Sequence, residues 1–299
     1  MQIKDKFLAI LRILAVCLLL FIIPVIVVGF IAGALRSPTM LPVIVNLPVI
    51  VINIINLTIY LPSLLFILLG CFVVSKIYKI KVHKLGMLFT KHWIKNVGLG
   101  IGIGTLSITT VWLLSILFGG YTITINNLDQ TVLIGIVFGF LASLMVGYSE
   151  EVMTRGLMTF VGVKNNKLFN AIIVGLLFSL MHLLSPSFNI LSMINTLLVA
   201  IVFSMLTWIS GDLWVAIGYH AIWNFILGNI FGISVSGNLS GKALLISLPS
   251  SSDLISGGEY GLEASLVFTM FLLIQIAFIY VLFIKKGKTN KEPVAPWLA

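Results

Sequence analysis

The chain has 299 residues, of which 60% are hydrophobic and only 9% charged, and its mean hydropathy is +1.17. This balance excludes an ordinary water-soluble domain. The net charge of +9 does not indicate nucleic-acid binding, because the basic residues gather beside apolar segments, as in membrane proteins.

Apolar runs long enough to cross a bilayer recur along the chain, and each crossing takes roughly 20 residues. They predict an all-α, polytopic transmembrane bundle of about eight spanning helices. The predicted helices lie at residues 7–35, 47–75, 94–118, 132–162, 167–184, 188–210, 213–233 and 264–284. The first run exceeds the roughly 7 to 15 residues of a signal-peptide core, so we expect it to be retained.

The basic residues predict the orientation of these helices. With the N-terminus inside, 14 of the 18 Lys and Arg residues fall on the cytoplasmic side. Among these are the Lys76 to Lys95 loop, Lys164 with Lys167, and the lysines that follow the last helix. The sequence therefore predicts a multi-pass protein of the cell membrane with both termini cytoplasmic, and with Arg36 and Lys242 on the outer face.

Two further features predict architecture. Alternate glycines, Gly98, Gly100, Gly102 and Gly104, form overlapping G-x-x-x-G pairs that permit close helix packing in lipid. Residues 234–263 are rich in Gly and Ser and predict a flexible outer loop, with a role in access to a buried site left open as the alternative. Both cysteines, Cys17 and Cys71, lie in apolar runs and predict no disulfide framework.

Ionisable residues inside the bilayer are costly, and three clusters of polar residues stand within the apolar runs. The first is Ser149 to Arg155 in the fourth helix. Glu151 and Arg155 are four residues apart and can pair on one helix face. Glu150 is rotated about 100° from Glu151, which leaves its carboxylate available for chemistry.

The other two clusters each place two side chains four residues apart. They are Phe178 with His182, and His220 with Asn224. Asp212, just before the seventh helix, is predicted to be an N-cap. A buried carboxylate beside a His can deprotonate a water, and a second His with Asn can donate hydrogen bonds to an oxyanion. Together these groups are suited to amide hydrolysis.

The order and spacing of the three clusters resemble the motifs of the CPBP family over residues 130–230. The family includes the Rce1-like type II CAAX prenyl endopeptidases, bacteriocin-processing peptidases and the Abi group. The resemblance implies an intramembrane endopeptidase in which Glu150 and His182 activate water and His220 with Asn224 form the oxyanion site. Glu151, Arg155 and Phe178 would support this site structurally.

The resemblance leaves the cofactor open. A glutamate-activated water needs none, whereas a divalent metal such as zinc would take Glu150, His182 and His220 as candidate ligands. The expected partners are the bilayer and a peptide or membrane-protein substrate, without nucleic acid. A prenylated substrate does not follow from the resemblance.

Three regions are predicted: residues 1–130 with the first three helices and the basic loop, the catalytic helical core at 131–233, and residues 234–299 with the outer loop, the last helix and a basic tail. Two other functions remain open. One is a non-enzymatic bacteriocin-immunity or membrane interaction protein on the same scaffold, and the other is a small transporter in which Glu and His relay protons.

Overall fold

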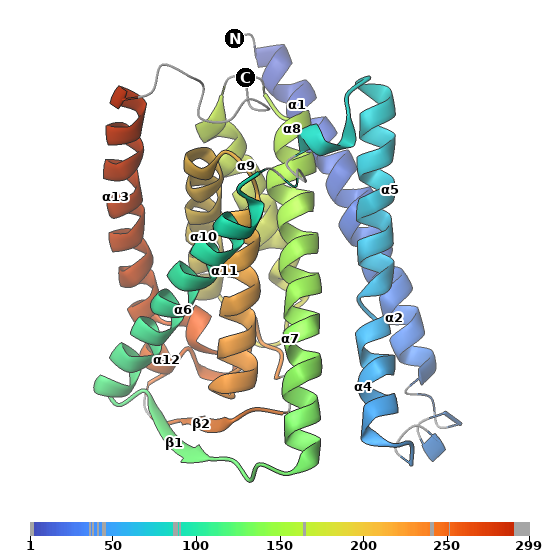
Figure 1. The fold of residues 1–299 in the computed structure, drawn as a ribbon, viewed down its shortest axis with the longest axis vertical. Helices are drawn as coiled ribbons and strands as arrows, with labels where there is room; N and C mark the ends of the chain where they lie inside the picture. The colour runs from blue at the N-terminus through green and yellow to red at the C-terminus, as the bar shows by residue number, and fades with distance from the viewer. Residues whose placement is uncertain are drawn as a thin grey trace.

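We describe the chain from a computed structural model, which is mostly helical (Figure 1). The structure describes residues 3–35, 37, 39–40, 42–43, 46–85, 89, 91–163, 166–239, 242–250 and 252–289. Arg36, Lys164 and Lys291, on which the predicted orientation partly depends, lie outside these residues.

The first part of the chain forms an arm of helices beside the bundle (Figure 1). One continuous helix comprises α1 (Ile3–Cys17), the π-helical turn η1 (Leu18–Ile22) and α2 (Ile23–Leu35). It is followed by α4 (Val49–Thr58), α5 (Leu61–Ile77) and the short 3₁₀ helix η2 (Val82–Leu85).

The remaining helices form the bundle that carries the polar clusters. They are α6 (Trp93–Leu117), α7 (Gln130–Glu151), the π-helix η3 (Val152–Met158), α8 (Thr159–Val161), α9 (Lys167–Met181), η4 (His182–Leu184), α10 (Ile190–Ser210), α11 (Trp214–Phe225), the π-helix η5 (Ile226–Ile230) and α13 (Leu266–Thr289).

Six helical stretches in the described residues are long and apolar enough to span a membrane. They are Lys4–Ile31, Val49–Ile77, Trp93–Leu117, Gln130–Val161, Lys167–Leu184 and Ile190–Ser210. The two other predicted spans are also helical but shorter, since α11 has 12 residues and the apolar part of α13 is Leu266–Leu282. The structure therefore supports a multi-pass membrane protein.

Helix α11 lies at the centre of the bundle and is almost completely buried. Its contact with α6 depends on glycine, because a Cβ at Gly100 would stand 2.2 Å from the Val215 carbonyl oxygen, and one at Gly218 would stand 2.5 Å from that of Val97. Gly104 is similarly close to Tyr219. The predicted helix contact is thus confirmed at Gly100 and Gly104, whereas Gly98 and Gly102 have no neighbour within 4 Å.

The prediction of a flexible loop at residues 234–263 is wrong. The segment contains strand β2 (Leu245–Pro249), the helix α12 (Asp253–Ser256) and the 3₁₀ turn η6 (Gly258–Tyr260), and η7 (Leu262–Ala264) follows at its end. Strand β2 pairs antiparallel with β1 (Tyr121–Ile125), with Ile123 opposite Ser247. Gly and Ser serve here as turn and cap residues, as at Gly257 with φ of 82°, so their abundance does not indicate disorder.

This sheet and α12 lie at the end of the bundle opposite the start of α1 and the end of α13 (Figure 1). The Tyr121 hydroxyl donates a hydrogen bond to the Ser256 carbonyl, and Ser115 Oγ donates one to the Ile255 carbonyl at 3.0 Å. The segment after α11 is therefore joined to the end of α6 and to β1.

Candidate active site

The first polar cluster stands where α7 passes into the π-helix η3. Glu151 is the last residue of α7 and is fully buried, whereas the Glu150 side chain is 27% exposed. Arg155 lies in η3 and donates from Nη1 to Glu151 Oε1 at 3.1 Å. The ion pair predicted from the four-residue spacing is confirmed, and the two adjacent glutamates have different surroundings.

Arg155 is held by more than its ion pair. Its Nη1 also donates to Thr154 Oγ1 at 2.7 Å, and the guanidinium lies 5.0 Å from the ring centre of Phe178 and 5.4 Å from that of Phe203. This position between two aromatic rings stabilises the buried cation, because the ring faces are electronegative.

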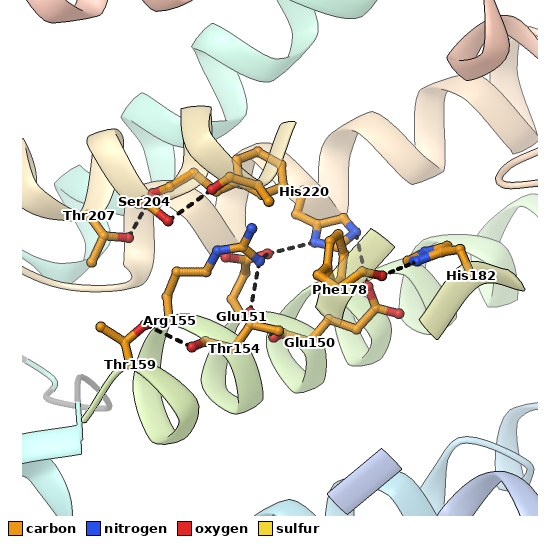
Figure 2. Close-up of polar contacts among 12 residues, drawn as sticks. Glu150, Glu151, Thr154, Arg155, Thr159, Phe178, His182, Ser204, Thr207 and His220 are labelled. Atoms are coloured by element: carbon orange, nitrogen blue, oxygen red, sulfur yellow. Dashed lines mark hydrogen bonds and ion pairs between the residues drawn. The ribbon is translucent and has the colours of Figure 1, made fainter. Parts of the chain in front are cut away.

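The far side of the Arg155 guanidinium borders a small cavity. Its Nε and Nη2 have no hydrogen-bond partner among the described residues. Thr159, Ser204 and Thr207 also line the cavity, which measures about 10 Å³ and so has room for about one water. Figure 2 shows these hydroxyls on the side of Arg155 away from Glu150.

His220 connects α11 to both glutamates (Figure 2). Its Nδ1 lies 3.0 Å from Glu151 Oε1, and since a carboxylate oxygen accepts, Nδ1 is the donor. Its Nε2 lies 3.7 Å from Glu150 Oε2, which is too long for a hydrogen bond. The imidazole stacks on Phe203, so its orientation is fixed while Nε2 is left available for another group.

His182 is connected to this cluster by contacts with Phe178. Its Nδ1 donates to the Phe178 carbonyl at 2.8 Å, so in the neutral ring Nε2 carries no proton and can accept one. The Phe178 ring packs edge-on against His182 at 4.9 Å and also faces His220 at 6.5 Å. The predicted shared face of Phe178 and His182 is confirmed.

Asn224 and Asp212 have different surroundings on either side of His220. Asn224 lies one turn further along α11, is partly exposed, and has no side-chain hydrogen-bond partner in the described part of the chain. Asp212 accepts from the Trp214 backbone N–H at 3.1 Å and from Asn96 Nδ2 at 2.6 Å. The N-cap of α11 is Leu213, so the prediction of Asp212 at that position is wrong by one residue. Asp212 still accepts from the first N–H of α11 and ties this helix to α6.

A metal centre at Glu150, His182 and His220 was left open as the alternative to a glutamate-activated water. Among the described residues, no group of three or more His, Cys, Asp or Glu side chains is arranged to hold a metal ion. The bond to Glu151 uses only Nδ1 of His220 and leaves Nε2 free, as in many metal-ligating histidines, so it does not count against a metal. The described side chains thus form no ready-made zinc site, and no chemical step below uses a metal ion.

The bond between Glu151 and His220 is the main contact that sequence reasoning missed. Spacing along one helix predicts pairs such as Glu151 with Arg155, but the His220 contact joins residues 69 positions apart. Thr154 could have been predicted to contact Arg155, because it is a polar residue inside the first cluster. Phe203 could not, because one aromatic residue in an apolar helix usually indicates contact with lipid or with the core.

Comparison with known proteins agrees with the resemblance seen in the sequence. The family model described as Type II CAAX prenyl endopeptidase Rce1-like matches residues 133–226. The match begins in α7 and ends just past α11, so it includes all three polar clusters. No curated protein and no solved structure matches the chain significantly.

Proposed function

We propose that this chain, whose residues 133–226 constitute an Rce1-like domain, is an intramembrane endopeptidase that hydrolyses a peptide bond of a membrane-associated protein or peptide. The observation that carries the proposal is the connected set Glu150, His220, Glu151 and Arg155 within membrane helices. Four ionisable groups are costly to keep in a bilayer, which favours a chemical role over a purely structural one.

Water activation is assigned to Glu150 and His182. Glu150 is the exposed member of the glutamate pair, so its carboxylate can accept a proton from water. The other hydrogen of that water can be donated to His182 Nε2, which is the acceptor atom of that ring. The oxygen then attacks the carbonyl carbon, and the protonated Glu150 gives its proton to the leaving amine.

Oxyanion stabilisation is assigned to His220 and Asn224. When His220 is protonated, Nδ1 donates to Glu151 while Nε2–H is available to the developing oxyanion. The charges then sum to zero over two carboxylates, one guanidinium and one imidazolium, which suits a medium of low dielectric constant. The Asn224 amide, which has no side-chain partner among the described residues, supplies a second donor.

The proposal includes an orientation in the membrane. We propose about eight crossings, with α11 and α13 completing the six long spans, and with both termini cytoplasmic in the cell membrane. Support comes from the Lys76 to Lys95 loop and the lysines near the end of the chain, which all fall on one side in this arrangement.

A comparison of membrane peptides tests this function and identifies the substrate. Peptides would be catalogued from cells that produce the wild-type chain and from cells that produce Glu150→Ala or His182→Ala. We expect products present only with the wild type, and accumulation of their precursors with both variants. Identical peptide sets, together with an immunity or binding phenotype that survives Glu150→Ala, would instead support the non-enzymatic alternative.

A further inference from the structure

The segment after α11 forms a folded cap, which we define as residues 234–239, 242–250 and 252–263. Tyr260 and Leu262 in the cap are among the most deeply buried large side chains of the described residues. Such burial fixes the position of the cap against the bundle.

Glu263 joins the cap to α11, the helix that carries His220 and Asn224. Its Oε1 accepts from Trp223 Nε1 at 2.9 Å. Its Oε2 accepts from the backbone N–H of Ser236 at 2.6 Å and from Ser236 Oγ at 3.0 Å. Three donors therefore converge on one carboxylate, an arrangement that a neutral amide cannot reproduce.

The position of Trp223 makes this bond relevant to the candidate active site. Trp223 directly precedes Asn224 and follows His220 by three residues, on one helix. Since consecutive helical residues are separated by about 100°, fixing the direction of Trp223 also fixes the rotation of α11 about its axis. The directions in which His220 and Asn224 point follow from that rotation.

The cap also contacts the turn that follows His182. Ser187 Oγ donates to Glu259 Oε2 at 2.8 Å. A Cβ at Gly237 would stand 2.1 Å from the Pro186 carbonyl oxygen, so cap and turn are in close contact. One folded segment thus touches α11, which carries His220, and the turn that follows η4, which carries His182.

We infer that Glu263 is a positioning residue, which holds α11 through Trp223 so that His220 and Asn224 face the scissile bond. This inference rests on the proposed endopeptidase function. Glu263 touches no reacting atom in it. The remaining Trp223 contacts, including stacking on Phe268 at 4.7 Å, keep the helix packed when the carboxylate is changed.

The test compares Glu263→Gln and Trp223→Phe with the wild type in liposomes. Trp223→Phe removes the N–H donor. Glu263→Gln leaves one acceptor oxygen, which cannot bond to Trp223 and to Ser236 together, so the connection between cap and α11 is broken in both variants. Misorientation of groups that act in the transition state lowers kcat more than substrate binding. We expect kcat to fall by about tenfold or more with KM within about twofold.

Two controls separate positioning from general damage. Asp253→Asn changes an exposed acid of the same cap and should leave kcat and KM unchanged. The double variant Glu263→Gln with Trp223→Phe should lose no more activity than the more affected single variant, because both changes remove the same bond. Additive losses in the double variant would overturn the inference.

Hydrogen exchange gives a readout that does not need turnover. Amides of residues 219–230 should exchange faster in Glu263→Gln than in the wild type, while those of α7 stay unchanged. Unchanged exchange, or wild-type kcat in Glu263→Gln, would overturn the positioning role. Failure of the endopeptidase proposal would be seen separately, as a wild-type chain that cleaves no more than Glu150→Gln.

Discussion

Glu151 accepts hydrogen bonds from two helical segments, through Arg155 of η3 and His220 of α11. Glu151, Arg155 and His220 are all buried, so bulk water cannot replace the carboxylate as a partner if it is lost. Glu150 has the opposite character, because it is partly exposed and 3.7 Å from its nearest charged partner. Two adjacent glutamates therefore make separable contributions to stability and to turnover.

Substituting each glutamate with glutamine tests this separation. Glu151→Gln leaves the Arg155 charge buried without its counter-charge, which typically costs about 3–5 kcal/mol. We expect a lower free energy of unfolding and lost turnover. Glu150→Gln should unfold like the wild type and lose turnover by about 100-fold or more. Thermal unfolding in detergent with a turnover assay measures both, and destabilisation by Glu150→Gln alone would contradict these assignments.

Helical spacing predicted the contacts between two residues of the same helix. The pairs Glu151 with Arg155 and Phe178 with His182 follow from the helical repeat alone. The His220 contact with Glu151 depends on how α7 and α11 pack, and no local pattern encodes that packing. The same reason explains why no sequence pattern indicated the contact of Glu263 with Trp223.

The backbone of the candidate active site differs from an ordinary α-helix in the π-helix η3. It begins directly after Glu151, and the Thr159 hydroxyl donates to the Thr154 carbonyl five residues earlier. Thr154 Oγ1 in turn donates to the Glu150 carbonyl at 2.5 Å. Such wide turns are rare and occur often at functional sites. Apolar periodicity does not reveal them, so the sequence predicted one uninterrupted helix.

The α6–α11 contact provides a prediction with a matched pair of glycines. Gly100→Ala places a methyl group against the Val215 carbonyl and must separate the helices, at a cost of about 1–3 kcal/mol. Gly98→Ala meets no atom within 4 Å and should be neutral or slightly stabilising, since alanine favours helix. Unfolding of the two variants in detergent compares them, and equal stability would contradict this packing.

At the scale of the whole molecule, hydropathy predicted the long helices but not the folded cap. Long apolar runs identify spans because the bilayer requires helical backbone pairing. The cap is built instead from short elements joined by backbone bonds, such as Leu244 N–H to the Asn229 carbonyl at 2.9 Å. These long-range contacts leave no periodic pattern in the sequence.

Orientation of the whole molecule can be measured by labelling single cysteines. Both native cysteines would first be replaced by serine, and Lys79→Cys and Asn127→Cys then introduced separately at exposed positions. A thiol reagent that cannot cross membranes should label position 127 in intact cells and position 79 only after the membrane is opened. Labelling of both positions in intact cells would contradict the proposed orientation.

The central claim is that this helical bundle hydrolyses peptide bonds with Glu150 as the base. Its most direct test uses purified chain in liposomes with the peptide whose precursor accumulates in cells carrying Glu150→Ala. We predict cleavage by the wild type and by the Asp253→Asn control, and a rate lower by about 100-fold or more for Glu150→Gln. Turnover by Glu150→Gln at the wild-type rate would contradict it.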